Sequence, residues 1–269
     1  MTLTVSNRVP QPPSGVTLLE VLVVVSMISI LASILLPGLA AAREQARAVT
    51  CRSNVSQIML ANTYYAQEHG VYCPGASGFL KNLHRWHGAR GRVSERFEPG
   101  RGPLEAYLGA EGEVRHCPTF PAAETAARTG GFERGCGGYG YNQAYLGVQL
   151  RRFASGEYVV EDDRAGVRAE LVRRPAETLM FADAAFAGSG LIEYSFAEPR
   201  FHPQFPGLRL DPSIHFRHRR LANVGWCDGH VDSRARSFSW SSGLYTGDPQ
   251  RLEIGWFGTS DDNRFFDLE

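Results

Sequence analysis

The strongest constraint on the fold is an apolar run at residues 16–36, VTLLEVLVVVSMISILASILL, whose only charged side chain is Glu20. An α-helix rises 1.5 Å per residue and a bilayer core is about 30 Å thick, so roughly 20 residues suffice to span it. A secretory signal peptide has a shorter apolar part that is followed by a small-residue cleavage site, whereas here Gly15 precedes the run. The run therefore predicts a membrane anchor.

Glu20 is unusual in such a helix, because a charged side chain at the bilayer centre costs at least ~2.5 kcal/mol and normally has a partner. Two interpretations are open. Glu20 lies one turn into the run, where its carboxylate can reach the interface by snorkelling. Alternatively, cleavage after Gly15 would give Val16 a new α-ammonium group, which can meet Glu20 of a neighbouring chain when identical helices bundle.

The residues around the run resemble the class III signal of type IV prepilins and type II secretion pseudopilins. In that family a prepilin peptidase cleaves after a glycine, leaves a glutamate as the fifth residue of the mature chain, and methylates the new terminus. Gly15 and Glu20 match these positions, and Pro37 lies where pilin helices often carry a kinking proline. Val16 departs from the pattern, because Phe or Met is more usual after the cut. The resemblance implies processing at Gly15 and Val16 and assembly through Glu20 and Pro37.

The resemblance also implies a location and partners. It places the chain in a bacterial inner membrane as a single-pass protein, with the leader cytoplasmic and the head extracytoplasmic, and later in a filament. The expected partners are copies of itself or related pilins, the prepilin peptidase and an inner-membrane assembly platform. Charge argues for the opposite orientation, since only Arg8 precedes the run while Arg43, Arg47 and Arg52 follow it. We expect the motif to decide the orientation.

The residues after the run favour a continuing helix, since they are rich in alanine. An apolar stripe at steps of three and four predicts one buried face; its members are Ala48, Cys51, Val55, Ile58, Asn62 and Tyr65. Gly70 is the expected end of this helix. We therefore predict a leader at residues 1–15 and a pilin-like helix at 16–70, of which 16–36 cross the membrane.

Residues 71–269 predict an α+β head, in which the second half of the helix packs on a small antiparallel β-sheet. The best strand candidates, from their alternation and flanking turn residues, are ETLMFADAAF at 177–186 and LANVGWCDGHVDSRA at 221–235. His218 followed by Asp228 and Gly229 resembles the H-X9-DG signature near the C-terminus of many bacterial prepilin-like proteins. The segments CRSN at 51–54, CP at 117–118, YGYN at 139–142 and MFADA at 180–184 also resemble that group.

Several residues are weak candidates for metal ligands. Two histidines and a carboxylate can hold a divalent ion, which makes His218, Asp228 and His230 one candidate set. The favoured alternative is a hairpin that turns at Asp228 and Gly229, a strong short turn signal. Asp261 and Asp262 suggest calcium, although the EF-hand spacing is absent. We expect no cofactor apart from this weak calcium candidate.

The five cysteines are spaced unlike a zinc ribbon, since no C-x-x-C pair occurs among Cys51, Cys73, Cys117, Cys136 and Cys227. Disulfides are plausible if the head is extracytoplasmic. Cys51 lies on the apolar stripe and faces the head, where Cys117 can meet it, and Cys73 with Cys136 would be the second pair. Any four cysteines allow three pairings, so the connectivity stays open.

The composition argues against extensive binding of nucleic acid, because 28 basic and 28 acidic residues give a formal net charge of zero. A local cluster of Arg217, Arg219 and Arg220 leaves an adhesive or DNA-binding minor pilin as an alternative. We expect no catalytic residues and an activity of assembly. The competing class is a membrane-anchored, metal-dependent enzyme.

Overall fold

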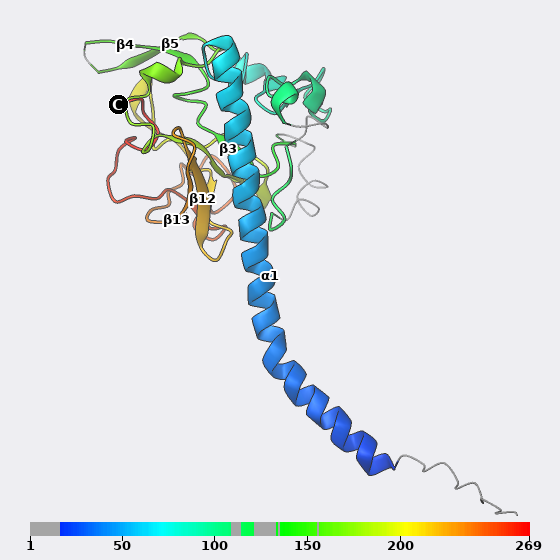
Figure 1. Cartoon of the computed structure of the whole chain (residues 1–269). Helices are drawn as coiled ribbons and strands as arrows, with labels where there is room; N and C mark the ends of the chain where they lie inside the picture. Colours follow the sequence, from blue (N-terminus) through cyan, green and yellow to red (C-terminus); the bar gives the residue numbers. More distant parts are fainter. Residues whose placement is uncertain (1–16, 109–113, 121–132, 134, 155) are drawn as a thin grey trace, which may run out of the picture. The chain divides into compact units, whose positions relative to one another are not determined.

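The computed structural model describes residues 17–108, 114–120, 133, 135–154 and 156–269. The chain divides into two compact units, Met1–Arg43 and Glu44–Glu269. A single helix, α1 (Leu18–His69), contributes to both units (Figure 1). The predicted leader and the residues Gly15 and Val16 lie outside the described part of the chain.

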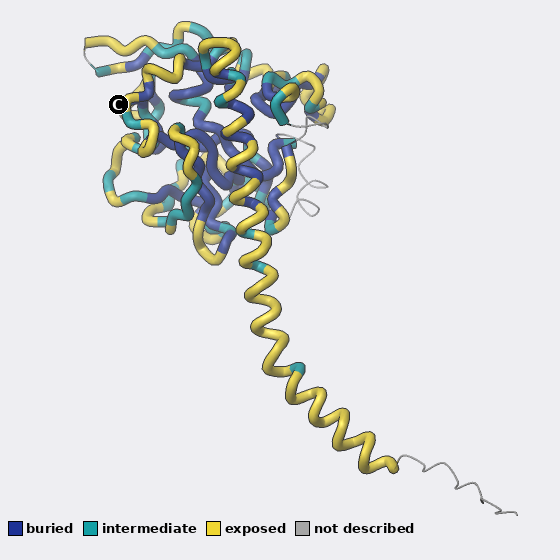
Figure 2. Tube along the Cα trace, in the orientation of Figure 1, coloured by how far each residue is buried: buried dark blue, intermediate teal, exposed yellow. Residues whose placement is uncertain are grey.

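In the first unit, α1 exposes its apolar side chains on every side (Figure 2). Its most apolar 18-residue window has a mean hydropathy of 2.6 and contains no buried residue, so by length and composition α1 can cross a membrane. The hydroxyl groups of Ser26, Ser29 and Ser33 donate to backbone carbonyls one turn earlier, which satisfies them without water.

In the second unit, one face of α1 is buried at the predicted spacing of three and four residues; the buried set is Cys51, Asn54, Val55, Ile58, Met59, Ala61, Asn62 and Ala66. The helix ends at His69, and Gly70 follows with a left-handed φ of 76° while its N–H donates to Ala66. This is the conformation that favours glycine at a helix C-terminus.

The face of α1 packs on a four-stranded antiparallel sheet with strand order β13-β12-β6-β3. The strands are β3 (Tyr139–Tyr141), β6 (Leu179–Asp183), β12 (Leu221–Trp226) and β13 (Val231–Ala235). A Cβ atom at Gly225 would lie 2.1 Å from Met59 Sδ and 2.9 Å from Val55 Cγ1, so the helix approaches the backbone of β12 directly. Both predicted strand segments are thus part of the sheet that supports α1.

The rest of the described head consists of short elements. Two-stranded antiparallel pairs are β1 (His84–Arg85) with β2 (Gly88–Ala89), β4 (Gln149–Arg152) with β5 (Tyr158–Asp162), β7 (Phe186–Ala187) with β8 (Leu191–Ile192), β9 (Phe201–His202) with β10 (Phe205–Arg209), and β11 (Ile214–His215) with β14 (Ile254–Gly255). Single 3₁₀ turns are η1 (Phe79–Lys81), η2 (Pro99–Arg101), η3 (Glu105–Tyr107) and η4 (Ala169–Leu171). The predicted α+β class, a long helix with a head of small antiparallel sheets, is confirmed.

Candidate functional site

A cluster of four metal-ligating side chains lies buried where α1 meets the sheet. Cys51 comes from α1, Cys117 from a loop, Asp183 from the end of β6, and His218 from the segment before β12. One ligand atom from each of the four lies within 4.8 Å of all the others. We call these four residues the buried cluster.

The contacts inside the buried cluster are short. The Cys51 thiol lies 3.0 Å from Cys117 Sγ and 3.0 Å from Asp183 Oδ1. His218 Nε2 lies 3.6 Å from Cys117 Sγ and 3.4 Å from Asp183 Oδ2. The four residues are at most 4% exposed, so solvent does not separate the donor atoms.

Asp183 is held in place by groups of opposite polarity. The backbone N–H of Asn223 donates to Asp183 Oδ2 at 2.7 Å, and Arg217 Nη2 lies 3.4 Å from Asp183 Oδ1. Arg217 also donates to the carbonyl groups of Gly138 and Ala184. A cation and hydrogen bonds offset part of the desolvation of a buried carboxylate, and Arg217 and the Asn223 N–H have this role at Asp183.

A second layer of polar groups surrounds the other cluster members. Tyr139 Oη lies 3.3 Å from Cys51 Sγ and accepts a hydrogen bond from Asn54 Nδ2 at 3.0 Å. His218 Nδ1 lies 3.7 Å from Glu44 Oε1. Both ring nitrogens of the histidine therefore face groups that carry or can carry negative charge.

The cluster shifts the acidity of its members in opposite directions. Burial raises the pKa of the Cys51 thiol and of the Asp183 carboxyl group. The hydrogen bond that Cys51 donates lowers the pKa of the Cys117 thiol, and the positive charge of Arg217 acts in the same direction. Cys117 is thus the sulfur that most readily carries negative charge.

A tight turn carries His218 into the cluster. His218 and Leu221 exchange two backbone hydrogen bonds of 3.0 Å, and the residues between them, Arg219 and Arg220, have φ values of 54° and 66°. Two consecutive residues with positive φ define the two-residue hairpin turn that favours Asn-Gly. Arginine in this conformation is strained by about 1–2 kcal/mol per residue.

We expect the double substitution Arg219→Asn with Arg220→Gly to raise the free energy of unfolding by about 1–2 kcal/mol, because Asn-Gly relieves that strain. The ion pair lost between the exposed Arg220 and the partly exposed Glu253 contributes at most about 1 kcal/mol. Urea denaturation of the detergent-solubilised chain measures the change. The exposed Arg96 lacks a positive φ, so Arg96→Gly should not stabilise the chain; a destabilised double variant would contradict the strain argument.

The metal candidates Asp228 and His230 lie away from the buried cluster. They form the turn between β12 and β13, where Gly229 has a φ of 97° and His230 Nδ1 contacts Asp228 Oδ1 at 2.6 Å. His218 precedes β12, whose six residues span roughly 20 Å at the rise of an extended strand. The structure therefore separates His218 from Asp228 and His230, and the hairpin interpretation describes that turn.

The predicted calcium candidates make other contacts. Asp261 accepts hydrogen bonds from Arg209 at 2.9 and 2.6 Å and from Arg200 at 3.3 Å. The hydrogen bonds from Arg209 lower the pKa of Asp261. Asp262 Oδ1 accepts the backbone N–H of Arg264 at 3.2 Å. Two guanidinium groups already bind the Asp261 carboxylate, and their positive charges disfavour a calcium ion at the same place.

All five cysteines lie in the described part of the chain, and each is a free thiol. Cys51 and Cys117 lie together in the buried cluster, as the stripe suggested they can. Cys73 packs beside α1, since its N–H donates to Asn62 Oδ1 at 2.9 Å. Cys136 lies in the turn that leads into β3, where its carbonyl accepts the N–H of Tyr139.

The head contains a second buried polar network. Arg85 forms a salt bridge of 2.8 Å with Glu133, and both side chains are at most 3% exposed. Ser195 Oγ donates to Glu133 at 2.5 Å and lies 2.8 Å from His87 Nε2. This serine and histidine are buried, and the serine proton is directed to the glutamate, so the arrangement is structural rather than nucleophilic.

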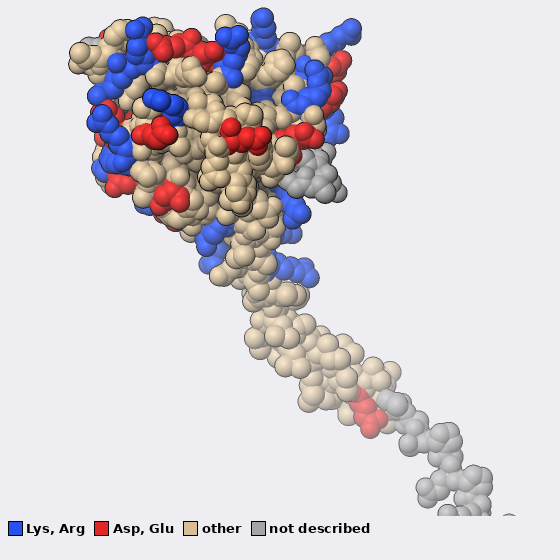
Figure 3. All heavy atoms as spheres, turned by 45° about the horizontal axis from the view of Figure 1, so that its top comes forward, with Lys and Arg blue, Asp and Glu red and all other residues tan. Residues whose placement is uncertain are grey.

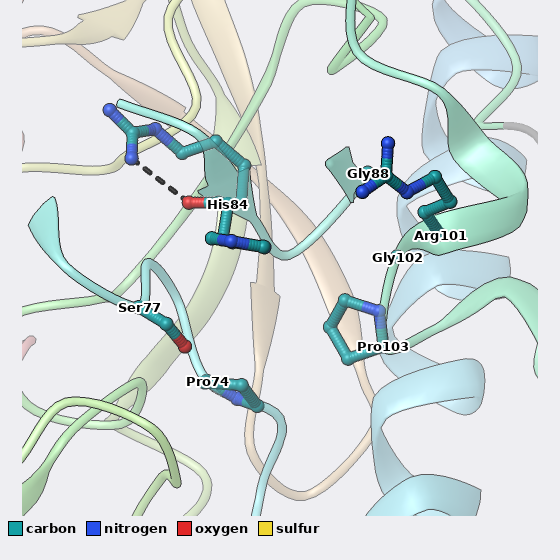
Figure 4. Close-up of a pocket in the computed structure, with 8 residues that line it drawn as sticks. Pro74, Ser77, His84, Gly88, Arg101, Gly102 and Pro103 are labelled. Atoms are coloured by element: carbon teal, nitrogen blue, oxygen red, sulfur yellow. Dashed lines mark hydrogen bonds between the residues drawn. The ribbon is translucent and has the colours of Figure 1, made fainter. Parts of the chain in front are cut away.

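A small pocket of about 230 Å³ adjoins this network at Arg85. Figure 4 shows Arg101 and Pro103 on one side of it and Ser77 and His84 on the other. Arg85 also lines the pocket, and its guanidinium donates to the His84 carbonyl. The volume of the pocket is below the roughly 300 Å³ at which ligand sites begin. The pocket therefore offers little support for an enzyme active site.

The first turn of α1 gives Glu20 hydrogen-bond partners within its own chain. Glu20 accepts hydrogen bonds from Thr17 N and Oγ1 at 2.8 and 2.9 Å, and Thr17 Oγ1 accepts the Glu20 N–H at 3.2 Å. This reciprocal pair is a capping box, which the spacing T-x-x-E signals. Within a single chain, Glu20 thus has a partner of its own.

Sequence reasoning named three of the four residues of the buried cluster but did not bring them together in one site. It paired Cys51 with Cys117 and identified His218, but it gave no role to Asp183, Tyr139 or Glu44. The available signal was the set of short segments quoted for their resemblance. The segments CRSN, CP, YGYN and MFADA supply Cys51, Cys117, Tyr139 and Asp183, and the histidine of the H-X9-DG spacing completes the site.

Comparison with known proteins gives one similarity. Residues 40–100 match the family model SBP_bac_10, described as "Protein of unknown function (DUF1559)". That family is typical of pilin-like, prepilin-type proteins. Neither the curated proteins nor the solved structures gave a match. The chain is therefore similar, over the second part of α1 and the start of the head, to a pilin-like family, and its first unit carries an apolar helix that can span a membrane.

Proposed function

We propose that the chain is a structural subunit of a type IV pilus-like or type II secretion pseudopilus filament, processed after Gly15 and assembled through its apolar helix. The observation that carries this proposal is the uncovered apolar part of α1, with a mean hydropathy of 2.6 over 18 residues. A surface this apolar needs lipid or other helices around it. The similarity of residues 40–100 to a pilin-like family supports the same function.

Assembly in this proposal uses one buried attraction. Cleavage after Gly15 frees the amine of Val16, which pairs with Glu20 of a neighbouring subunit as the helices bundle. Pairing offsets the desolvation of both charges only in the correct register, so Glu20 selects that register. The exchange of the Thr17 contacts for the neighbour's amine converts a cap within one chain into a contact between chains.

The proposal includes the location and partners implied by the resemblance. The leader would face the cytoplasm and the head the extracytoplasmic side of a bacterial inner membrane. Prepilin peptidase and an assembly platform would act on the chain there, before it joins a filament in the periplasm or at the cell surface. Methylation at Val16 belongs to the same proposal.

We assign the chain assembly rather than catalysis. The residues of the metal-dependent enzyme alternative are divided between the two ends of β12, and the buried Ser195 directs its proton to Glu133 rather than to His87. For the DNA-binding alternative, Arg219 and Arg220 are exposed, whereas the Arg217 side chain is buried against Asp183. On the face of the head drawn in Figure 3, acidic and basic side chains lie interspersed, which does not favour a polyanion.

Gly15→Leu is expected to block processing, because the peptidase needs a small residue before the cut. Intact-mass spectrometry of the chain purified from its native membrane would then show the full-length mass, whereas the unmodified chain would lack residues 1–15. The neighbouring Ser14→Ala is the control and should still be shortened. A functional native protein that retains its first fifteen residues would contradict the proposed function.

A further inference from the structure

We propose that Cys51, Cys117, Asp183 and His218 form a closed, tetrahedral binding site for one divalent transition-metal ion of the zinc type. The inference is independent of filament assembly, since all four residues belong to the head unit. It rests on the convergence of four ligand atoms within 4.8 Å of one another in a buried place.

The donor set fits zinc. Zinc accepts thiolate sulfur, imidazole nitrogen and carboxylate oxygen at about 2.0–2.3 Å, and tetrahedral ligands at such distances are about 3.3–3.8 Å apart. The two sulfur atoms here are 3.0 Å apart, and His218 Nε2 lies 3.6 Å from Cys117 Sγ. The Asp183 carboxylate bridges the other side of the cluster, with Oδ1 3.0 Å from Cys51 Sγ and Oδ2 3.4 Å from His218 Nε2. The Cys51 thiol is closer to its neighbours than a tetrahedral ligand would be, so it must move outward to admit the ion. Four protein ligands leave no open position, which is the pattern of a structural site.

The charges of the site also fit a divalent cation. With zinc bound, two thiolates and the Asp183 carboxylate carry three negative charges. Zinc supplies two positive charges, and the guanidinium of Arg217, 3.4 Å from Asp183, supplies the third. The buried group is then neutral overall, which a low-dielectric interior favours.

The surrounding groups match the outer shell of a metal site. A metal-bound imidazole usually donates its second N–H to a carboxylate, which fixes the ring. His218 directs Nε2 at the other three ligands, while its buried Nδ1 makes no hydrogen bond and faces the Glu44 carboxylate at 3.7 Å. The backbone N–H of Asn223 donates to Asp183 Oδ2 at 2.7 Å and so fixes the orientation of that carboxylate.

A groove on the head borders the site at His218. It has a volume of about 440 Å³ and is lined by His218, Arg219, Leu221 and Ser233 with residues of α1 that include Ala48 and Val49. Once bound, the ion would join four segments that are distant in the sequence. We therefore expect it to stabilise the packing of α1 on the sheet.

The test is cobalt and zinc binding by the full-length chain, purified in detergent with its thiols reduced. Tetrahedral Co²⁺ bound by thiolates gives intense ligand-field bands and a sulfur-to-metal charge-transfer band. We expect one Co²⁺ per chain with this spectrum, its displacement by Zn²⁺, and a higher unfolding temperature with Zn²⁺ that is lost with a chelator.

Variants locate the ion. Cys117→Ser should lose the cobalt spectrum, whereas Cys227→Ser, at a thiol outside the cluster, should keep it. Glu44→Gln should weaken Zn²⁺ binding about 10–100-fold while retaining the cobalt spectrum, as the loss of an outer-shell group does. The inference is overturned if the reduced, folded wild-type chain takes up no Co²⁺ or Zn²⁺, or if loss of binding follows Cys227 rather than Cys117. A Cys51–Cys117 disulfide in the native protein, with no metal uptake after reduction, would also overturn it.

Discussion

Glu20→Gln is expected to leave the chain in the membrane and to reduce filament yield at least about tenfold, because the neighbouring amine then lacks its anionic partner in an apolar seam. An unpaired charge in such a seam costs at least ~2.5 kcal/mol, and 1.4 kcal/mol corresponds to a factor of ten in an equilibrium constant. Glutamine is the informative replacement, since it retains the hydrogen-bonding side chain that Thr17 contacts. Filaments sheared from cells and quantified against total membrane-bound chain measure the effect.

Thr17→Ala is the matched control for this experiment. It removes the hydroxyl group of the capping box but keeps the Glu20 charge, so it should cost only about 0.5–2 kcal/mol at the helix start and leave filaments abundant. If Glu20 acts only as a cap, the pattern reverses: Glu20→Gln assembles normally and Thr17→Ala is the damaging change. Equal filament yield from Glu20→Gln and the unmodified chain would remove the proposed mechanism of assembly.

The parts of the fold that were predictable are those encoded by local periodicity. The apolar run and the stripe from Cys51 to Asn62 repeat every three or four residues, so they report a helix and its buried face without any knowledge of partners. The hairpin of β12 and β13 was readable for the same reason, since the Asp228–Gly229 turn and both strands are adjacent in the chain.

The sheet order and the buried cluster were not readable, because they depend on contacts between distant segments. The pairing of β6 with β3 on one side and β12 on the other leaves no periodic signal. In the same way, the ligand atoms of the cluster come from positions 51, 117, 183 and 218, with none of the close spacing that marks a zinc ribbon. His218 was identified, but near neighbours in the sequence, Asp228 and His230, were proposed as its partners instead of neighbours in space.

The second large effect is expected at the buried salt bridge between Arg85 and Glu133. Glu133→Gln should lower the free energy of unfolding of the head by about 3–5 kcal/mol, because it leaves the guanidinium of Arg85 uncompensated in a dry environment. The ring of Phe196, 5.1 Å from the guanidinium carbon, cannot replace a full negative charge. Urea denaturation followed by tryptophan fluorescence measures the loss, since Trp86 is adjacent to Arg85 and fully buried.

The chain provides a control with the same geometry and a different environment. Arg151 and Glu161 approach to 2.8 Å, the same distance as Arg85 and Glu133, but their side chains are 60% and 48% exposed. Glu161→Gln should therefore cost less than about 1 kcal/mol. The double substitution Arg85→Met with Glu133→Leu should recover most of the stability that Glu133→Gln loses, because it removes both buried charges together. If Glu133→Gln and Glu161→Gln are equally stable, desolvation does not govern what the buried ion pair contributes to the free energy of unfolding. The polar network around Ser195 and His87 would then be held by packing alone.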